Sequence, residues 1–114
     1  LLGANLALSS ATPTISSGFG TTPSVTAGTA AAFRVDVGTG GAASAGVIGL
    51  PTATTGWNCS VEDITATTAN AANVRTLQLS STTTTATVEN QTVSTGAAVA
   101  WTASDILAVS CTAF

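Results

Sequence analysis

The sequence predicts an all-β protein, a small antiparallel β-sandwich or jelly roll. Short runs alternate between apolar and polar residues, most clearly Phe33–Val37 and Trp57–Val61. Gly, Pro, Asn and Ser separate these runs at short intervals, and no stretch has the apolar spacing of an amphipathic helix. About seven to nine short strands with turn residues between them are typical of a sandwich or a jelly roll.

The stretch Gly38–Val61 is predicted to organise the core. It contains a glycine-rich bend, a short apolar strand at Gly46–Leu50 closed by Pro51, and the alternating run that begins at Trp57. This pattern predicts strand, turn and strand, with the large side chain of Trp57 at the centre of the core.

The other elements follow the same two signals. Pro13 favours an edge strand or a strand start. Gly18–Gly28 is rich in turn residues, and Thr65–Asn73 lacks a large apolar residue and is expected to be a loop. In two later strands, Leu77 with Leu79 and Leu107 with Val109 and Cys111 are predicted to face inward. The remaining extended segments are Ala11–Ser17, Val74–Leu79, Thr82–Gln91, Ala98–Trp101 and Ile106–Phe114.

The length of 114 residues suits one domain. Residues 1–12 are assigned to an N-terminal arm or connecting segment. Leu6 and Leu8 alternate there, so a first strand at Leu1–Ser10 is the alternative. Residues 13–114 are assigned to the sandwich. Each apolar run is interrupted well before the ~20 residues of a membrane-spanning helix, so no membrane insertion is expected.

Charged residues make up 6% of the chain, against about 25% in an average soluble domain. Arg34 and Arg75 are the basic residues, and the net charge is -3. Phosphate-backbone binding needs a cluster of Lys and Arg, so nucleic acid is not an expected partner. Two interpretations of the neutral exterior stay open: much of it faces other subunits, or it is a hydroxyl-rich solvent surface.

Catalytic chemistry finds little support in the sequence. There is no His to act as a base for a Ser, Thr or Cys nucleophile. Glu62 and Asp63 are strand neighbours that should point to opposite faces, which makes them a poor glycosidase pair. Arg34 and Asp36 share one strand face and suggest a cross-strand ion pair. The chain is therefore expected not to be an enzyme, with no catalytic residues, metal site or cofactor.

Four side chains have more than one interpretation. Cys59 and Cys111 form a disulfide across the core if the protein is secreted, or remain two buried thiols if it is assembled in a cytosol. Trp57 and Trp101 pack in the core or between subunits, or they stack on a glycan.

Several segments, taken in order, resemble a β-module of tailed-bacteriophage virion proteins of the tail fibre, head fibre or capsid decoration type. The matching stretches cover most of the chain. They are T-P-T-I-S-S-G-F-G-T-T-P-S-V (Thr12–Val25), V-G-T-G-G-A-A-S-A-G-V-I-G-L-P (Val37–Pro51), T-G-W-N-C (Thr55–Cys59), S-T-T-T-T-A-T-V-E-N (Ser81–Asn90) and A-W-T-A-S-D-I-L-A-V-S-C (Ala100–Cys111).

The resemblance implies a non-enzymatic virion structural protein on the exterior of the head or tail, assembled as a homotrimer. The module would be a fibre or spike that contacts other virion proteins and, as a further expectation, a host-surface glycan. One alternative is a capsid decoration protein whose Leu1–Ser10 arm clasps a neighbour. A second is a pilin-like filament subunit, which an intact Cys59–Cys111 disulfide would favour, whereas free thiols would favour the virion protein. A carbohydrate-binding or depolymerising module is the third.

Overall fold

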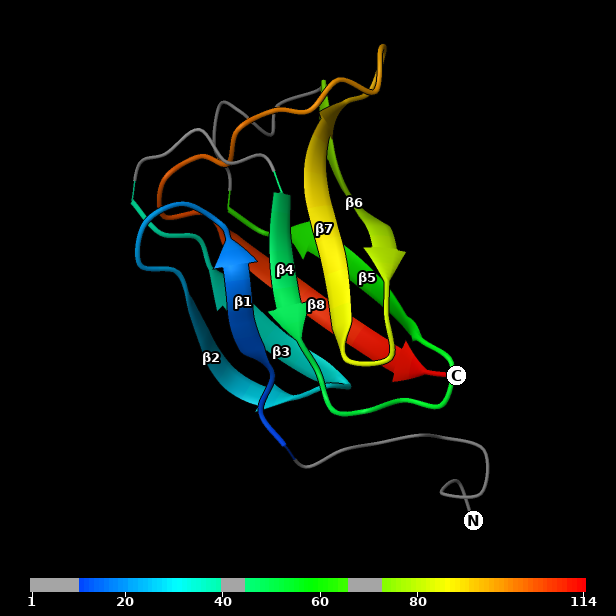
Figure 1. The fold of residues 1–114 in the computed structure, drawn as a ribbon. Helices are drawn as coiled ribbons and strands as arrows, with labels where there is room; N and C mark the ends of the chain where they lie inside the picture. The colour runs from blue at the N-terminus through cyan, green and yellow to red at the C-terminus, as the bar shows by residue number, and fades with distance from the viewer. Residues whose placement is uncertain (1–10, 40–44, 66–72) are drawn as a thin grey trace.

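The computed structural model is a sandwich of two four-stranded antiparallel sheets, and it describes residues 11–39, 45–65 and 73–114. One sheet has the strand order β1-β4-β7-β6 and the other the order β2-β3-β8-β5. Figure 1 shows the first sheet in front of the second, with the strands of the two sheets crossing obliquely. The strands are β1 (Thr14–Gly18), β2 (Ser24–Thr29), β3 (Ala32–Asp36), β4 (Ala45–Gly49), β5 (Trp57–Asp63), β6 (Val74–Ser81), β7 (Thr85–Thr92) and β8 (Ile106–Ala113).

Alternation along the strands creates the two-layer structure. In β8 the residues Leu107, Val109 and Cys111 are buried, while the intervening Ala108 and Ser110 are exposed. Strand β3 alternates in the same way and pairs with β8 in matching register, so that Phe33 lies opposite Val109 and Val35 opposite Leu107. Both sets of apolar side chains therefore face the other sheet, as the alternating pattern predicts.

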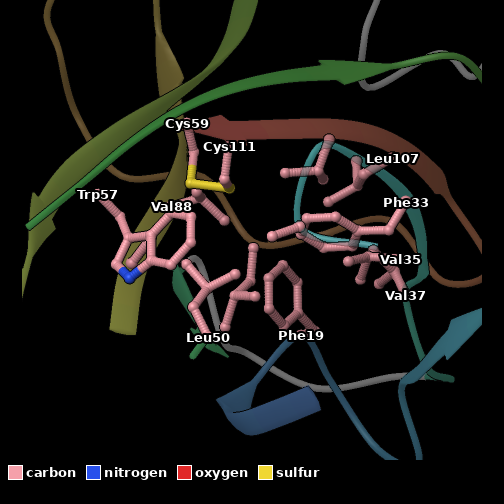
Figure 2. Close-up of a cluster of buried hydrophobic side chains, with 14 of the residues drawn as sticks. Phe19, Phe33, Val35, Val37, Leu50, Trp57, Cys59, Val88, Leu107 and Cys111 are labelled. Atoms are coloured by element: carbon pink, nitrogen blue, oxygen red, sulfur yellow. A yellow bond between two sulfur atoms is a disulfide. The ribbon is translucent and has the colours of Figure 1, made fainter. Parts of the chain in front are cut away.

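The core lies between the sheets, and Figure 2 shows how its larger side chains meet. Trp57 is 2% exposed and belongs to this core, but it lies at one side of the cluster rather than at its centre. Its indole N–H donates to the carbonyl oxygens of Pro51 at 3.0 Å and Thr83 at 3.2 Å, both in loops. The buried apolar residues are Phe19, Ala30, Phe33, Val35, Val37, Ile48, Leu50, Ala53, Trp57, Cys59, Ala86, Val88, Trp101, Leu107, Val109 and Cys111.

Phe19 fills the core from the connection between β1 and β2. Its side chain is fully buried, and its backbone has a φ of 62°, a left-handed conformation that is uncommon outside glycine. The ring packs on Trp101, with centroids 5.2 Å apart, and lies directly against the backbone of Gly46 in β4. A glycine is needed at position 46 because a Cβ atom there would overlap the Phe19 ring.

The edges of both sheets are irregular or capped. The register of β1 shifts between Ile15 and Ser17, that of β2 between Thr26 and Gly28, and that of β6 between Gln78 and Ser80. Bulges of this kind interrupt the regular row of N–H and C=O groups that another strand would need for pairing.

The outer edge of β5 is covered by side chains from β6. The carboxamide of Gln78 donates to the Trp57 carbonyl at 2.8 Å and accepts from the Cys59 N–H at 2.5 Å. The Ser81 hydroxyl accepts from the Trp57 N–H at 3.3 Å. Strand β6 thus joins the two sheets along this side of the sandwich.

The structure corrects three expectations for the elements. The turn-rich segment Gly18–Gly28 contains most of strand β2, because its small residues pair with β3 around a bulge. Leu77 and Leu79 face outward rather than inward: Leu77 lies opposite Glu89 on the outer face, Leu79 is 48% exposed, and Gln78 between them takes the inward position opposite the buried Val88. Ala98–Trp101 forms no strand and contributes only a bridge from Ala98 to Gln91.

Other expected elements agree with the structure. Strand β1 begins directly after Pro13, and its position at the edge of a sheet fits the missing N–H of that proline. Most of the N-terminal arm or connecting segment assigned to residues 1–12 and most of the expected loop Thr65–Asn73 lie outside the described residues.

Candidate functional site

Cys59 and Cys111 are joined by a disulfide bond with an S–S distance of 2.03 Å. They are direct cross-strand partners in β5 and β8, with Cα atoms 4.1 Å apart. The bond therefore ties neighbouring strands of one sheet, and does not cross the core from sheet to sheet as the sequence suggested. Both cysteines are buried, and Figure 2 shows the bond among the core side chains near Trp57 and Val88.

Neither tryptophan offers a ring face to a sugar. Trp57 is 2% and Trp101 6% exposed, and Trp101 packs on Phe19 inside the sandwich. Of the two interpretations of these residues, this burial fits core packing. Within the described ranges, the buried indole nitrogen of Trp101 has no hydrogen-bond partner, whereas that of Trp57 has two.

Two buried polar residues lie among the apolar ones. Asn90 on β7 is fully buried and accepts a hydrogen bond from the Thr76 hydroxyl of β6 at 2.7 Å, while no residue that the structure describes accepts from its Nδ2. Asp105 is also fully buried, and its backbone carbonyl accepts from the Val37 N–H at 2.8 Å. Sequence reasoning placed neither residue in the interior.

Arg34 and Asp36 form an ion pair along one strand, β3, two residues apart. The sequence correctly placed both side chains on one face of the strand, but the pair runs along β3 between residues 34 and 36 and not across to a neighbouring strand. The partner that Asp36 takes from a neighbouring strand is Thr26, whose hydroxyl donates at 2.7 Å. Burial alone would raise the pKa of Asp36, but the hydrogen bonds from Arg34 and Thr26 and the Arg34 charge lower that pKa below its ordinary value of 3.8.

One cross-strand row on the outer face of the β2-β3-β8-β5 sheet carries both signs of charge. Ala108 of β8 pairs with Arg34 of β3 on one side and with Glu62 of β5 on the other. The Arg34 side chain is 49% exposed. Within the described part of the chain, Glu62 is not engaged by any hydrogen bond or ion pair.

A shallow, open hollow of about 520 Å³ lies on this face over the middle of β8. Small side chains form most of its floor, because Ala32, Ser60, Ala108 and Ser110 all project outward here. Glu62 lines the hollow, whereas Arg34 does not line it and is held toward Asp36. The Arg34 cation and the Glu62 carboxylate, which lines the hollow, thus lie on either side of Ala108.

The outer face of the other sheet satisfies its charges internally. Arg75 of β6 donates to the Gln91 side chain at 3.4 Å, and Gln91 in turn donates to the Glu89 carboxylate at 2.8 Å. These groups form a hydrogen-bonded series along the surface. The unengaged Glu62 therefore distinguishes the two faces.

Among the described residues, no three His, Cys, Asp or Glu side chains are grouped as metal ligands would be. No helix in the described part of the chain is long and apolar enough to cross a membrane. Comparison of the chain with protein-family models, with curated proteins and with solved structures found no match. The phage resemblance and the functions it implies therefore stay predictions.

The roles of Gln78 and Ala108 in these surfaces could not be recognised from the sequence. Gln78 and Ala108 are ordinary residues in strand-like runs, and no local pattern marks one as a cap and the other as the middle of a charged row. Both properties depend on which strands are neighbours. A signal was present for Glu62 and Arg34, which the alternation of β5 and β3 places on the faces opposite Trp57 and Phe33.

Proposed function

We propose that this chain is a non-enzymatic structural module that works by assembling with copies of itself and with other proteins. The observation that carries the proposal is the character of the outer sheet faces. The exposed positions of β3, β5 and β8 hold Ala, Ser, Thr and Asn, with Arg34 and Glu62 as the charged residues among them. Covering such a face removes few ions from water, and ions are the groups whose burial costs most.

Within this class, the first candidate is a tailed-bacteriophage virion protein. In this proposal the chain is a homotrimeric fibre or spike module on the exterior of the head or tail, with contact to the host surface as a further role. The support is the ordered set of sequence blocks between Thr12 and Cys111, together with a sandwich fold compatible with a spike module. A capsid decoration protein is the near alternative, in which the Leu1–Ser10 arm attaches to a neighbouring subunit.

The disulfide favours a second candidate, a pilin-like subunit of an extracellular filament. A buried Cys59–Cys111 bond is expected in a protein that folds in an oxidising compartment, and is less expected for assembly in a reducing cytosol. The sheet edges argue against this candidate, because strand donation needs a regular open edge. Strands β1, β2 and β6 carry bulges and β5 is capped by Gln78, so the edges favour association through faces.

Native mass spectrometry of the purified chain at low and high salt tests the proposal. A discrete trimer is the result expected for the fibre or decoration protein. An open ladder of oligomers would shift the assignment to the filament subunit. A strict monomer at all concentrations would overturn self-assembly as the function of this chain.

A further inference from the structure

We propose that the outer face of the β2-β3-β8-β5 sheet is a two-fold contact surface for a second copy of this chain, with Arg34 of each copy bound to Glu62 of the other. This inference goes beyond the trimeric module proposed above. It identifies a surface and its occupant, and it requires assemblies with an even number of copies.

The charges of Arg34 and Glu62 are complementary under a two-fold rotation. Arg34 and Glu62 occupy one cross-strand row, one strand spacing to either side of Ala108, or about 4.8 Å each way. A two-fold axis parallel to β8 and passing over Ala108 exchanges these two positions. When two copies face each other across this axis, each Arg34 lies over the partner's Glu62, and two identical ion pairs form.

The Arg34 guanidinium and the Glu62 carboxylate both retain unused hydrogen-bonding capacity. In the described part of the structure, the Arg34 guanidinium bonds Asp36 through Nε alone, which leaves its two terminal nitrogens available. Glu62 has no partner there, although it lies in a protein with few charges. An arginine held by one carboxylate and open to a second is a pre-organised donor, because less side-chain freedom is lost on binding.

The shape of this sheet face also fits the contact. Arg34 projects from the face and does not line the hollow, whereas Glu62 lines it from the β5 side. The same two-fold axis directs the stem and head of Arg34 into the partner's hollow, toward Glu62. The small side chains of Ala108 and Ser110 allow the two sheets to approach closely enough for this contact.

The opposite face and the edges fit this contact less well. On the β1-β4-β7-β6 sheet, Arg75, Gln91 and Glu89 are already hydrogen-bonded to one another. The sheet edges are bulged or capped. The Arg34–Ala108–Glu62 row therefore combines exposure, both signs of charge and an unengaged acid.

A mixing experiment with two charge-reversed variants tests the proposal. In Glu62→Arg each contact pairs two arginines, and in Arg34→Glu each contact pairs two glutamates. We expect each variant alone to associate at least about ten-fold more weakly than the wild type, because juxtaposed like charges oppose binding. An equimolar mixture restores complementary pairs in mixed assemblies, so mixed species with an even number of copies should appear in the native mass spectrum.

A disulfide cross-link between copies tests where the proposed two-fold axis lies. Ala108 meets its own counterpart on the proposed axis, so Ala108→Cys should form a disulfide between copies under mild oxidation. Ala45→Cys, on the outer face of the other sheet, is the matched control and should not. Circular dichroism confirms that each variant is folded before its mass is measured.

The outcomes separate this inference from the proposed function. Dimers or hexamers that the single variants weaken and the mixture restores would support the two-fold contact. A wild-type trimer without even-numbered species would overturn the contact and leave the trimeric module intact. Even-numbered species that neither charge reversal affects, or equal cross-linking at positions 108 and 45, would also overturn it.

Discussion

The carboxamide of Gln78 donates a hydrogen bond to the carbonyl oxygen of Trp57 at 2.8 Å, and these residues belong to edge strands of different sheets. The same carboxamide accepts the N–H of Cys59 at 2.5 Å. One side chain thus takes the place of a neighbouring strand for β5. It also links the strand that carries half of the disulfide to the other layer of the sandwich.

Replacing Gln78 with Leu should destabilise the fold by about 1–3 kcal/mol, because two backbone groups of β5 lose their partner. Chemical denaturation monitored by tryptophan fluorescence measures this change. Gln91→Leu is the matched control, since the Gln91 side chain bonds the side chains of Arg75 and Glu89 on the outer face, and surface substitutions usually change stability by less than about 0.5 kcal/mol. Equal effects at both positions would show that the Gln78 contacts are not specifically stabilising.

Gly46→Ala should destabilise the fold by about 1–3 kcal/mol, because the added methyl group would overlap the fully buried ring of Phe19. Phe19→Leu leaves space beside the same backbone. The double variant should therefore be more stable than the sum of the single changes predicts, by at least about 0.5 kcal/mol in a double-mutant cycle. Strict additivity in thermal or urea unfolding would contradict the packing of Phe19 on Gly46.

Removing the disulfide in a Cys59→Ala, Cys111→Ala variant should lower the free energy of unfolding. The bond closes a loop with a sequence separation of 52 residues, for which chain entropy predicts about 4 kcal/mol, and measured losses of about 2–5 kcal/mol are typical. Urea unfolding without reductant gives the comparison. Unchanged stability would mean that β5 and β8 need no covalent link.

The burial of both cysteines leads to a separate expectation for native protein. A small water-soluble reductant should reduce the bond slowly, at a rate that rises with denaturant, because access requires opening of the sandwich. Alkylation followed by mass spectrometry counts the thiols released. Complete reduction within seconds in native buffer would contradict a buried bond.

Asp36 should make stability depend on pH at the acidic end. Its pKa is lower in the folded than in the unfolded chain, so the carboxylate stabilises the fold above about pH 4, and this contribution is lost as pH falls through the folded pKa. Asp36→Asn should therefore be less stable than wild type at pH 7, and the difference should shrink toward pH 2. A constant difference across that range in urea unfolding would exclude Asp36 as the titrating group.

Local sequence predicted much of the fold. Residues Phe33–Val37 and Ile106–Phe114 alternate so regularly that their strands and inward faces follow from the side-chain period of two. The same period gave the wrong face for β6, because Leu77 and Leu79 face outward and the polar Gln78 faces inward, where it hydrogen-bonds to β5. It also failed in Gly18–Gly28, where glycine and proline suggested only turns although Ser24–Thr29 pairs with β3.

The candidate surface was less predictable than the fold. The alternation of β5 placed Glu62 on the face away from Trp57, and that of β3 placed Arg34 away from Phe33. Nothing local indicated that β8 lies between these two strands, because its residues are more than forty positions away in the sequence from either one.

The sequence by itself determined an all-β sandwich with sparse charge, because alternation, turn residues and composition act over a few neighbouring residues. Only the tertiary structure decided that Cys59 and Cys111 are cross-strand partners, that Gln78 caps β5, and that Arg34 and Glu62 flank Ala108. Each of these depends on strand order and register. Both are set by the packing of the whole core, and several alternative pairings of the same strands would satisfy the local pattern equally well.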